Sequence, residues 1–203
     1  MTKVNPVKAL TSGQFTTADI GKTVYISNSV AATQEWRIAD VNHDSTTGTV
    51  DLFPKYILTN TGIGFGAGNY YKGSSLRTWL NGELYGGFVE EIKNAMKVQS
   101  IESGTDILND KVKCPSLMEL GLHFHINSSS KDKYGQIYPL FGTEQLSRNV
   151  LAVYKTIDDA PVIFWSRTYY YGGSCQTYGV YNGVITDNSY ANKQRYIVAC
   201  IRI

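Results

Sequence analysis

The sequence has little cysteine. Its three cysteines are Cys114, Cys175 and Cys200 in a chain of 203 residues. No two of them have C-x-x-C spacing, and an odd number cannot pair completely within one chain. This pattern excludes a disulfide scaffold and a zinc knuckle. We therefore expect free thiols, most of them buried.

Long hydrophobic runs are also missing. No stretch approaches the roughly 18 consecutive apolar residues that a membrane span requires. Residues 1–10 contain two lysines but no apolar core of a secretory signal peptide. We expect a protein that is made in the cytoplasm, carries no signal peptide and does not insert into a membrane.

Charge of one sign is not concentrated anywhere in the chain. Nineteen Lys and Arg residues are scattered among seventeen Asp and Glu residues, so the net charge is +2. A nucleic-acid-binding surface needs clustered positive charge, and we therefore expect no nucleic-acid partner. The hydrophobic content of 42% with 12% aromatic residues is typical of a globular domain.

Strand-like patterns occur at both ends of the chain. Apolar and polar residues alternate from Gly21 onward, and the dipeptide Asn182-Gly183 is typical of a hairpin turn. The preceding residues 1–20 are polar and interpreted as an N-terminal arm or linker, which leaves residues 21–203 as a single domain. The predicted strands are residues 24–26, 36–41, 49–53, 161–165, 178–185 (a hairpin) and 195–203.

Helical patterns lie between these strands. Ser74 or Ser75 can cap a helix that ends at Gly86-Gly87, and its apolar stripe is formed by Leu76, Trp79, Leu80 and Leu84. Residues 88–96 repeat the stripe, and the capping-box spacing of residues 116–119 predicts a third short helix. Four glycines in residues 60–69 predict a loop. Strands at both ends with two or three helices between them favour an α+β domain with antiparallel pairing.

The segment 165–193 has a composition unlike the rest of the chain. Seven of the fifteen tyrosines lie in residues 165–196, interleaved with glycine, serine and asparagine. Tyrosine offers a large rigid contact area, and Ser, Gly and Asn adapt their hydrogen bonds, so the segment is typical of a recognition surface. The candidate binding residues are Tyr169, Tyr170, Tyr171, Gln176, Tyr178, Tyr181, Asn182, Asn188, Tyr190 and Asn192.

Catalytic and metal-binding patterns are incomplete. His123 and His125 would lie on the same face of a strand, and they would need a third ligand such as Asp132 or His43 to hold a metal ion. Cys175 could act as a nucleophile beside a histidine, but no elbow such as G-x-S-x-G supports this role. We therefore expect no catalytic residue, no metal and no cofactor.

Several motifs in order along the chain resemble one family. They are the runs E-W-R-I-A-D-V at residues 35–41, K-Y-I-L at 55–58, S-S-L-R-T-W-L-N-G-E at 74–83, D-K-V at 110–112, F-W-S-R at 164–167 and V-A-C-I-R-I at 198–203. Over about residues 21–203 the chain resembles an uncharacterised domain family that is common in phage virion proteins and bacterial surface proteins.

The resemblance implies a C-type-lectin-like fold related to formylglycine-generating enzymes and to the variable receptor-binding proteins of phages. It implies structural roles for Arg77 and Arg167, and a core that contains Trp36, Leu76, Trp79, Leu80, Trp165 and Ile201. It also implies that the recognition surface consists of the loops between Trp165 and Arg195, joined by residues 60–71. The catalytic cysteine pair of the enzymes and the acidic calcium ligands of true C-type lectins have no counterpart in this sequence. Neither the oxidase chemistry nor calcium-dependent sugar binding is therefore expected.

The resulting functional hypothesis is a phage virion protein, either a capsid decoration or a tail-associated module. Its expected partners are other virion subunits, further copies of itself, and a host-surface glycan or protein. Three alternatives stay open: a bacterial surface binding protein, an enzyme distantly related to formylglycine-generating enzymes or to cell-wall hydrolases, and a purely structural subunit that the N-terminal arm attaches to an assembly.

Overall fold

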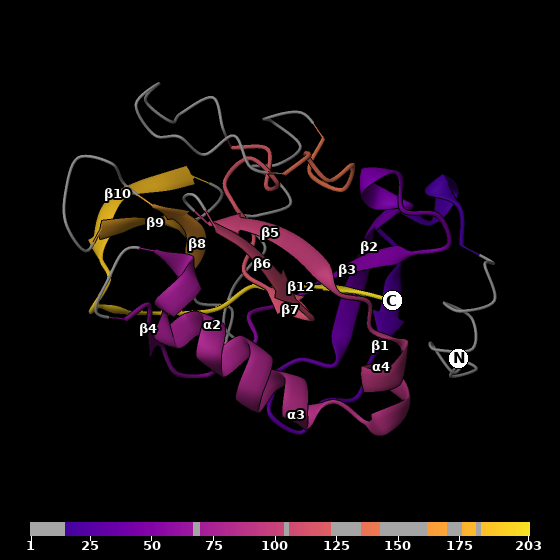
Figure 1. Ribbon diagram of the computed structural model, residues 1–203, viewed down its shortest axis with the longest axis horizontal. Coiled ribbons are helices and arrows are strands. Elements are labelled where there is room, and N and C mark those ends of the chain that lie inside the picture. The colour runs from indigo at the N-terminus through magenta and orange to yellow at the C-terminus, as the bar shows by residue number, and fades with distance from the viewer. Residues whose placement is uncertain are drawn as a thin grey trace.

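The protein has an α+β fold with mostly antiparallel strands and one main helix, as a computed structural model shows (Figure 1). This confirms the predicted class. The structure describes residues 15–66, 70–103, 106–122, 135–142, 162–169, 176–181 and 184–203. Of residues 169, 176–179 and 185–190 it describes the backbone alone.

A five-stranded antiparallel sheet forms the centre of the domain. Its strands are β1 (Thr23–Tyr25), β2 (Glu35–Val41), β3 (Val50–Pro54), β7 (Val112–Lys113) and β12 (Cys200–Arg202), in the order β1-β2-β3-β12-β7. The last strand lies inside the sheet, because Ile201 pairs with Leu52 on one side and with Val112 on the other. The predicted closing strand 195–203 is therefore interrupted, and β12 is only its final part.

The main helix is continuous through α2 (Ser75–Trp79), a π-helical turn η4 (Leu80–Leu84) and α3 (Tyr85–Gly87). Ser74 caps it, because its Oγ accepts a hydrogen bond from the Arg77 N–H at 3.0 Å. Leu76, Leu80 and Leu84 are fully buried, as predicted. The prediction that Trp79 belongs to the core is wrong, because its side chain is only partly buried.

The π-helical turn places Asn81 against the neighbouring strand β7. The Asn81 Nδ2 donates to the Val112 carbonyl at 2.9 Å, and its Oδ1 accepts from the Val112 N–H at 3.2 Å. One extra residue in a helical turn redirects a side chain, and here the redirected amide fastens the helix to the sheet.

Two further predictions concern the segment after the main helix. The second helix is confirmed as α4 (Glu90–Ala95), with Ile92 and Met96 buried. The prediction of a third helix is wrong. Ser116 and Glu119 do exchange the two hydrogen bonds of a capping box, at 2.9 and 3.1 Å, but the chain makes only one turn and then reverses at Gly121, whose φ is +72°.

A hairpin that the sequence did not predict lies between the helices and β7. Its strands are β5 (Gln99–Ser103) and β6 (Asp106–Asp110), paired from Gln99 opposite Asp110 to Ser103 opposite Asp106. The expectation that helices alone separate the first strands from the last ones is therefore wrong.

The C-terminal strands form a second sheet of three. They are β8 (Ile163–Tyr169), β9 (Gln176–Tyr181) and β10 (Val184–Tyr190), in the order β10-β9-β8. The predicted hairpin is confirmed, although its turn residues lie outside the described residues. Beside it, β4 (Ile63–Gly64) pairs with β11 (Gln194–Arg195), so the predicted glycine loop contains a short strand.

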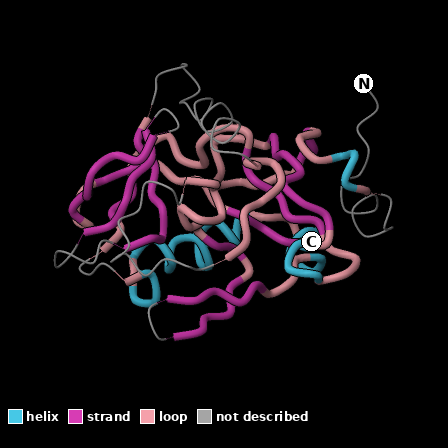
Figure 2. Tube along the Cα trace, turned by 90° about the horizontal axis from the view of Figure 1, so that it is seen from above, coloured by secondary structure: helices cyan, strands magenta, loops and turns pink. Residues whose placement is uncertain are grey.

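Short 3-10 turns complete the described secondary structure. They are η1 (Thr17–Asp19), η2 (His43–Ser45) and η3 (Tyr71–Gly73). Of the predicted arm, residues 1–14 lie outside the described residues, while Phe15 and Ile20 are partly buried against the core. Seen from above, strands and loops make up most of the chain and helices a small part (Figure 2). No described helix is both long and apolar enough to cross a membrane.

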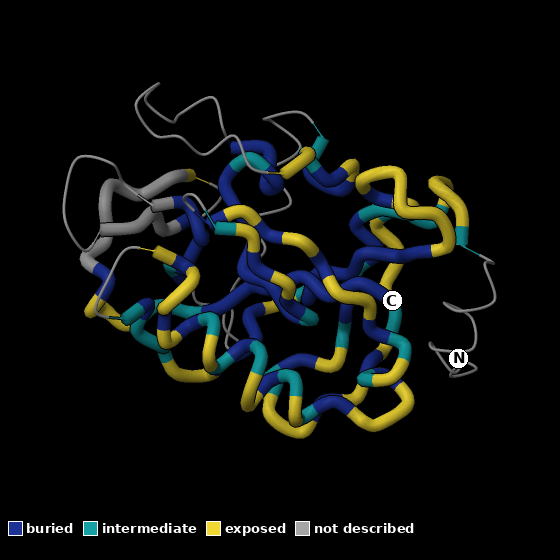
Figure 3. The backbone as a smooth tube through the Cα atoms, viewed as in Figure 1, coloured by how far each residue is buried: buried dark blue, intermediate teal, exposed yellow. Residues whose placement is uncertain are grey.

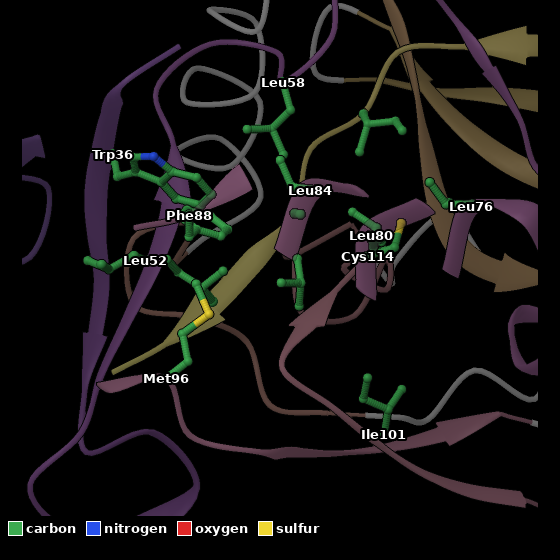
Figure 4. Packing of buried hydrophobic residues seen from close by; sticks show 14 of the residues in the cluster. Trp36, Leu52, Leu58, Leu76, Leu80, Leu84, Phe88, Met96, Ile101 and Cys114 are labelled. Carbon is green, nitrogen blue, oxygen red and sulfur yellow. The ribbon is translucent and has the colours of Figure 1, made fainter. Parts of the chain in front are cut away.

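Two hydrophobic clusters form the core, and buried residues line the central strands (Figure 3). In the first cluster Trp36 packs on Phe88 with ring centroids 5.9 Å apart, next to the leucines of the main helix (Figure 4). The second is built on Phe53, whose ring meets Tyr138 and Phe141 edge-on. The remaining predicted core residues, Trp36, Leu76, Leu80, Trp165 and Ile201, are fully buried.

Candidate functional site

The candidate binding residues fall mainly on the three-stranded sheet. Tyr169 lies on β8, Gln176, Tyr178 and Tyr181 lie on β9, and Asn188 and Tyr190 lie on β10, while Asn192 follows β10. Tyr181 and Asn192 are exposed. Tyr170, Tyr171 and Asn182 lie outside the described residues. The backbone thus collects most of the candidate residues on one sheet.

An apolar row crosses this sheet at one end. Val184 pairs with Tyr181, and Tyr181 pairs with Ile163. Directly paired residues of antiparallel strands project to the same face, so these three side chains lie side by side. Tyr181 is 41% exposed and Val184 44%, which are high values for large apolar side chains. We call Val184, Tyr181 and Ile163 the apolar row.

The opposite face of the same sheet is buried at Val180 and Phe164. These neighbours of Tyr181 and Ile163 in sequence are completely buried in the second core cluster. Trp165, two residues after Ile163, lies on the same face as the apolar row, is completely buried in the first core cluster, and its indole Nε1 donates to the Ile63 carbonyl at 2.6 Å. Strand β8, which carries Ile163, is therefore held by both core clusters.

Exposed polar residues lie along β4 and β11, beside the edge of the sheet that β8 forms, and we call them the polar rim. Tyr196 joins this segment to β8, because it exchanges backbone hydrogen bonds with Ile163 and Trp165. The chain approaches closely at Gly62, where a Cβ would lie 2.8 Å from the Gln194 Cβ, so only glycine fits there. The exposed residues of the polar rim are Asn60, Thr61, Asn192, Lys193 and Gln194.

Sequence reasoning named Asn192 and the vicinity of residues 60–71 but missed most of this arrangement. Val184 and Ile163 were not candidates, because single aliphatic residues in a strand give no signal of exposure. The pairing of Val184 with Tyr181 follows from the Asn182-Gly183 turn and could have been predicted, whereas the pairing of Ile163 with Tyr181 depends on how β8 and β9 align.

Beneath β8 lies a group of buried charges. The Glu119 carboxylate accepts hydrogen bonds from Lys113 Nζ at 2.8 Å and from the Arg167 guanidinium, whose Nη2 lies at 3.1 Å. Arg167 Nη1 also donates to the Cys114 carbonyl at 2.9 Å. We call Lys113, Glu119 and Arg167 the enclosed cluster, because no member has more than 4% of its side chain exposed. The structural role predicted for Arg167 is confirmed.

Electrostatics keep the carboxylate of the enclosed cluster ionised. Burial alone would raise the pKa of Glu119, but the positive charges of Arg167 and Lys113 and their hydrogen bonds lower it to about 2. Two hydrogen-bonded cations around one anion are the arrangement that a buried carboxylate needs. The enclosed cluster therefore ties β7 and β8 to the turn at residues 116–121.

Arg77, the other arginine with a predicted structural role, binds a carboxylate as well. Its Nε and Nη2 contact Asp110 at 2.9 and 2.7 Å, which joins the main helix to β6. Hydrogen bonding with Asp110 raises the pKa of Arg77. A forked arginine–carboxylate pair of this kind fixes orientation as well as distance.

A second charged group lies on the neighbouring strands β3 and β12 of the five-stranded sheet and on the turn before β3. The Arg202 guanidinium forms a forked pair with Asp51 at 2.6 and 2.7 Å and contacts Asp44 at 3.2 Å. Burial would lower the pKa of Arg202, but the hydrogen bonds to Asp51 raise it overall. We call Asp44, Asp51 and Arg202 the open cluster, because the Asp44 side chain is 44% exposed.

The two described cysteines are free and buried, as predicted. Burial raises the thiol pKa of both Cys114 and Cys200 well above its ordinary value. A thiol that stays protonated is a poor nucleophile and a poor metal ligand. Cys175 lies outside the described residues.

The histidines predicted as possible metal ligands are not brought together in the described structure. His123, His125 and Asp132 lie outside the described residues, and His43 is buried against Asp40 and Tyr138. Within the described part of the chain, no three His, Cys, Asp or Glu side chains gather in a group that could hold a metal ion.

Comparison with known proteins gives one match. The sequence profile of a family described as "Domain of unknown function (DUF6273)" matches residues 47–202. No curated protein and no solved structure matches the chain. The matched stretch contains the main helix, the enclosed cluster and the whole three-stranded sheet, and it spans well over half of the chain. The chain therefore belongs to the DUF6273 family of domains of unknown function.

Proposed function

We propose that this domain is a non-enzymatic display module that presents the apolar row and the polar rim to a partner. The observation that carries this proposal is that Tyr181 and Val184 are both exposed and directly paired, while Phe164 and Val180 on the other face of the sheet are completely buried. A single exposed apolar residue needs no explanation, but an aromatic and an aliphatic side chain in register form a continuous contact surface.

The support under this surface favours recognition by a preorganised site. Trp165 and Phe164 belong to the two different core clusters, so β8 is held from both faces. Arg167, two residues further along β8, is fixed by the enclosed cluster. A rigid mount lowers the entropy that is lost when a surface residue becomes ordered on binding.

The polar rim supplies what the apolar row lacks. Its exposed amide and hydroxyl groups, from Asn60, Thr61, Asn192 and Gln194, can donate and accept hydrogen bonds, and Lys193 adds a positive charge. An aromatic centre beside adaptable polar groups is the composition of many protein recognition surfaces.

We further propose that the module acts in a phage virion, as a capsid decoration or tail-associated protein with a C-type-lectin-like fold. This proposal is supported by the resemblance of residues 35–41 and 74–83 to phage virion and bacterial surface domains. The partner would be a host receptor, a host glycan or a neighbouring virion subunit. A bacterial surface protein would use the same face toward a cell-surface partner.

The test removes the apolar row and leaves the rest of the surface unchanged. Tyr181→Ser with Val184→Ser should reduce binding to host cells, or incorporation into purified particles, by roughly tenfold or more. Tyr25→Ser with Val98→Ser is the matched control, because both of these side chains are 54% exposed and lie outside the site.

Equal loss in the control pair would contradict the proposal, since general surface hydrophobicity would then explain the binding. Unchanged binding and unchanged incorporation in the Tyr181 and Val184 variant would also contradict it. Thermal unfolding of both variants shows whether the domain is intact.

A further inference from the structure

The carboxamide of Asn81 occupies an outer edge of the five-stranded sheet. Strand β7 lies at the end of the strand order and pairs with β12 alone among the described strands. On its other side, Asn81 Oδ1 accepts the Val112 N–H at 3.2 Å, and Asn81 Nδ2 donates to the Val112 carbonyl at 2.9 Å. These are the two hydrogen bonds that a residue of a neighbouring strand would make. Asn81 therefore closes an edge to which another strand could otherwise bind.

The full hydrogen-bonding capacity of this carboxamide is used. A primary amide has two N–H donors and an oxygen that accepts two hydrogen bonds. Besides the bonds to Val112, Asn81 Nδ2 donates to the Arg77 carbonyl at 3.3 Å, and Oδ1 accepts the Lys111 N–H at 3.2 Å. A carboxylate could not replace the amide, because it has no hydrogen to donate. An aspartate at this position would place a negatively charged oxygen against the carbonyls of Arg77 and Val112.

The residue that follows Asn81 is glycine, which makes the asparagine chemically labile. Without a side chain on Gly82, its main-chain nitrogen can attack the Asn81 Cγ unhindered. The N–Cγ bond forms, the Cγ–Nδ2 bond breaks, and Nδ2 leaves as ammonia together with the proton of the Gly82 nitrogen. One water molecule then opens the cyclic imide. The product is aspartate or isoaspartate, and in isoaspartate the main chain is one methylene longer.

The fold opposes this reaction at Asn81. In a helical turn such as η4 each main-chain N–H points along the helix axis, so the Gly82 nitrogen is not directed at the Asn81 Cγ. The four hydrogen bonds of the carboxamide hold it on β7 and away from Gly82. Gly82 itself is exposed, and a Cβ there would meet nothing within 4 Å. Docking of the helix on β7, and not exclusion of water, therefore protects the dipeptide.

We propose that Asn81-Gly82 is a deamidation site that is protected while the main helix is docked on β7, and that its modification loosens the helix. Each opening of this contact exposes the Asn81 amide to attack by the Gly82 nitrogen. The product has no donor for the Val112 carbonyl, so the helix is held less tightly when the contact closes again. The only co-reactant is water. The inference is independent of the proposed function, because it involves neither the apolar row nor the polar rim.

Peptide mass spectrometry of the full-length chain tests the protection. The chain is incubated at mildly alkaline pH with and without a denaturing concentration of urea. In urea, Asn81 should deamidate at a rate similar to that of Asn182-Gly183, the second Asn-Gly of the sequence. Without urea, deamidation of Asn81 should be slower by about tenfold or more. Gly82→Ala is the chemical control: its methyl group hinders the attack and has open space in the fold, so it should slow the reaction in urea.

Pulse proteolysis tests the effect on the helix. Partly deamidated chains are brought to the urea concentration at which half of the unmodified chain is native, and a short protease pulse removes unfolded chains. Chains modified at Asn81 should be depleted about fivefold among the survivors. Asn81→Asp, which makes one of the two products directly, should lower the melting temperature by roughly 5 °C. Asn94→Asp, at an exposed asparagine of α4, is the matched control and should change it by less than about 2 °C.

Three results would overturn the proposal. The first is equal deamidation of Asn81 with and without urea, and the second is deamidation in urea of Asn182 but not of Asn81. The third is equal survival of modified and unmodified chains in the protease pulse. Because that experiment uses the wild-type chain, it decides the question even if Asn81→Asp does not fold.

Discussion

The enclosed and open clusters have opposite charge patterns. In the enclosed cluster one carboxylate, Glu119, lies between two cations, and in the open cluster one cation, Arg202, lies between two carboxylates. The first has no exposed member, whereas the second reaches solvent through Asp44. The two clusters should therefore differ in the free energy needed to break an ion pair. An ion in contact with water can lose its partner at little cost, because water solvates the charge, whereas an enclosed ion cannot.

The two groups occupy positions that suit this difference. The enclosed cluster lies under β8, where a fixed geometry supports the apolar row. The open cluster lies at the turn between β2 and β3, where the Asp44 side chain is in contact with water. Tyr138 links them, since its ring stacks on His43 and also lies under Lys113.

Breaking the enclosed cluster should have the largest effect. Glu119→Gln removes the buried negative charge that Lys113 and Arg167 share, and we expect the free energy of unfolding to fall by about 3–5 kcal/mol. Chemical denaturation at neutral pH measures this. Asp106→Asn, an exposed carboxylate paired with Lys72, should change stability by less than about 0.5 kcal/mol. A Glu119 variant as stable as that control would refute the comparison.

Acid should weaken the same cluster without a mutation. The pKa of Glu119 is lowered to about 2 from an ordinary value of 4.5, so its contribution to stability is complete above about pH 4.5. It is lost as the pH falls toward 2, and the loss amounts to roughly 3 kcal/mol. Denaturation curves across this range should show the loss in the wild type, and Glu119→Gln should lack that component.

Breaking the buried half of the open cluster should have a smaller effect. Asp51→Asn removes the forked partner of Arg202 but leaves Asp44 and access to water, and we expect a loss of about 2 kcal/mol. Chemical denaturation beside Glu119→Gln gives the ranking. An Asp51 variant less stable than the Glu119 variant would reverse the proposed order of the two clusters.

The smallest effect is expected at the exposed end. Asp44→Asn removes a contact of 3.2 Å from a side chain that is 44% exposed, and stability at neutral pH should stay within about 1 kcal/mol of the wild type. The same denaturation assay measures it. A loss as large as that of Asp51→Asn would contradict the prediction, because exposure of Asp44 to water would then not weaken its ion pair with Arg202.

The parts of the fold that were predicted correctly are those with local signals. The main helix has its cap at Ser74 and its stripe of leucines within about four turns, and the β9–β10 hairpin has its turn dipeptide in the sequence. Such signals depend on residues a few positions apart, so tertiary structure is not needed to recognise them.

The β5–β6 hairpin was missed for a physical reason. Its inward positions include the polar Gln99 and Asp110, while Ile107 faces outward and is 69% exposed. The inward polar groups are satisfied by distant partners: Asp110 by Arg77, and Gln99 by the Cys200 carbonyl at 3.4 Å. Alternation of apolar and polar residues cannot reveal a strand when the partners lie so far away in sequence.

The candidate binding residues were named from the composition of residues 165–193, which says nothing about how their side chains are arranged. Tyrosine content indicated residues that fall mainly on one sheet, but Ile163 and Val184 join Tyr181 only through strand register. Only one member of the enclosed cluster was predicted in its observed role: Arg167 was expected to be structural, while its partner Glu119 was interpreted as part of a helix cap. The capping-box hydrogen bonds predicted between Ser116 and Glu119 are present, but the helix that they were expected to begin is not.

The central place of β12 has a consequence for how the chain folds. Arg202 bonds to Asp51, which lies 151 residues earlier. During synthesis, β3 and β7 have no β12 between them until residues 200–202 have left the ribosome, and Asp51 lacks the Arg202 guanidinium. The sheet can therefore close only after translation of this segment, and until then both strand edges are open to pairing with other chains.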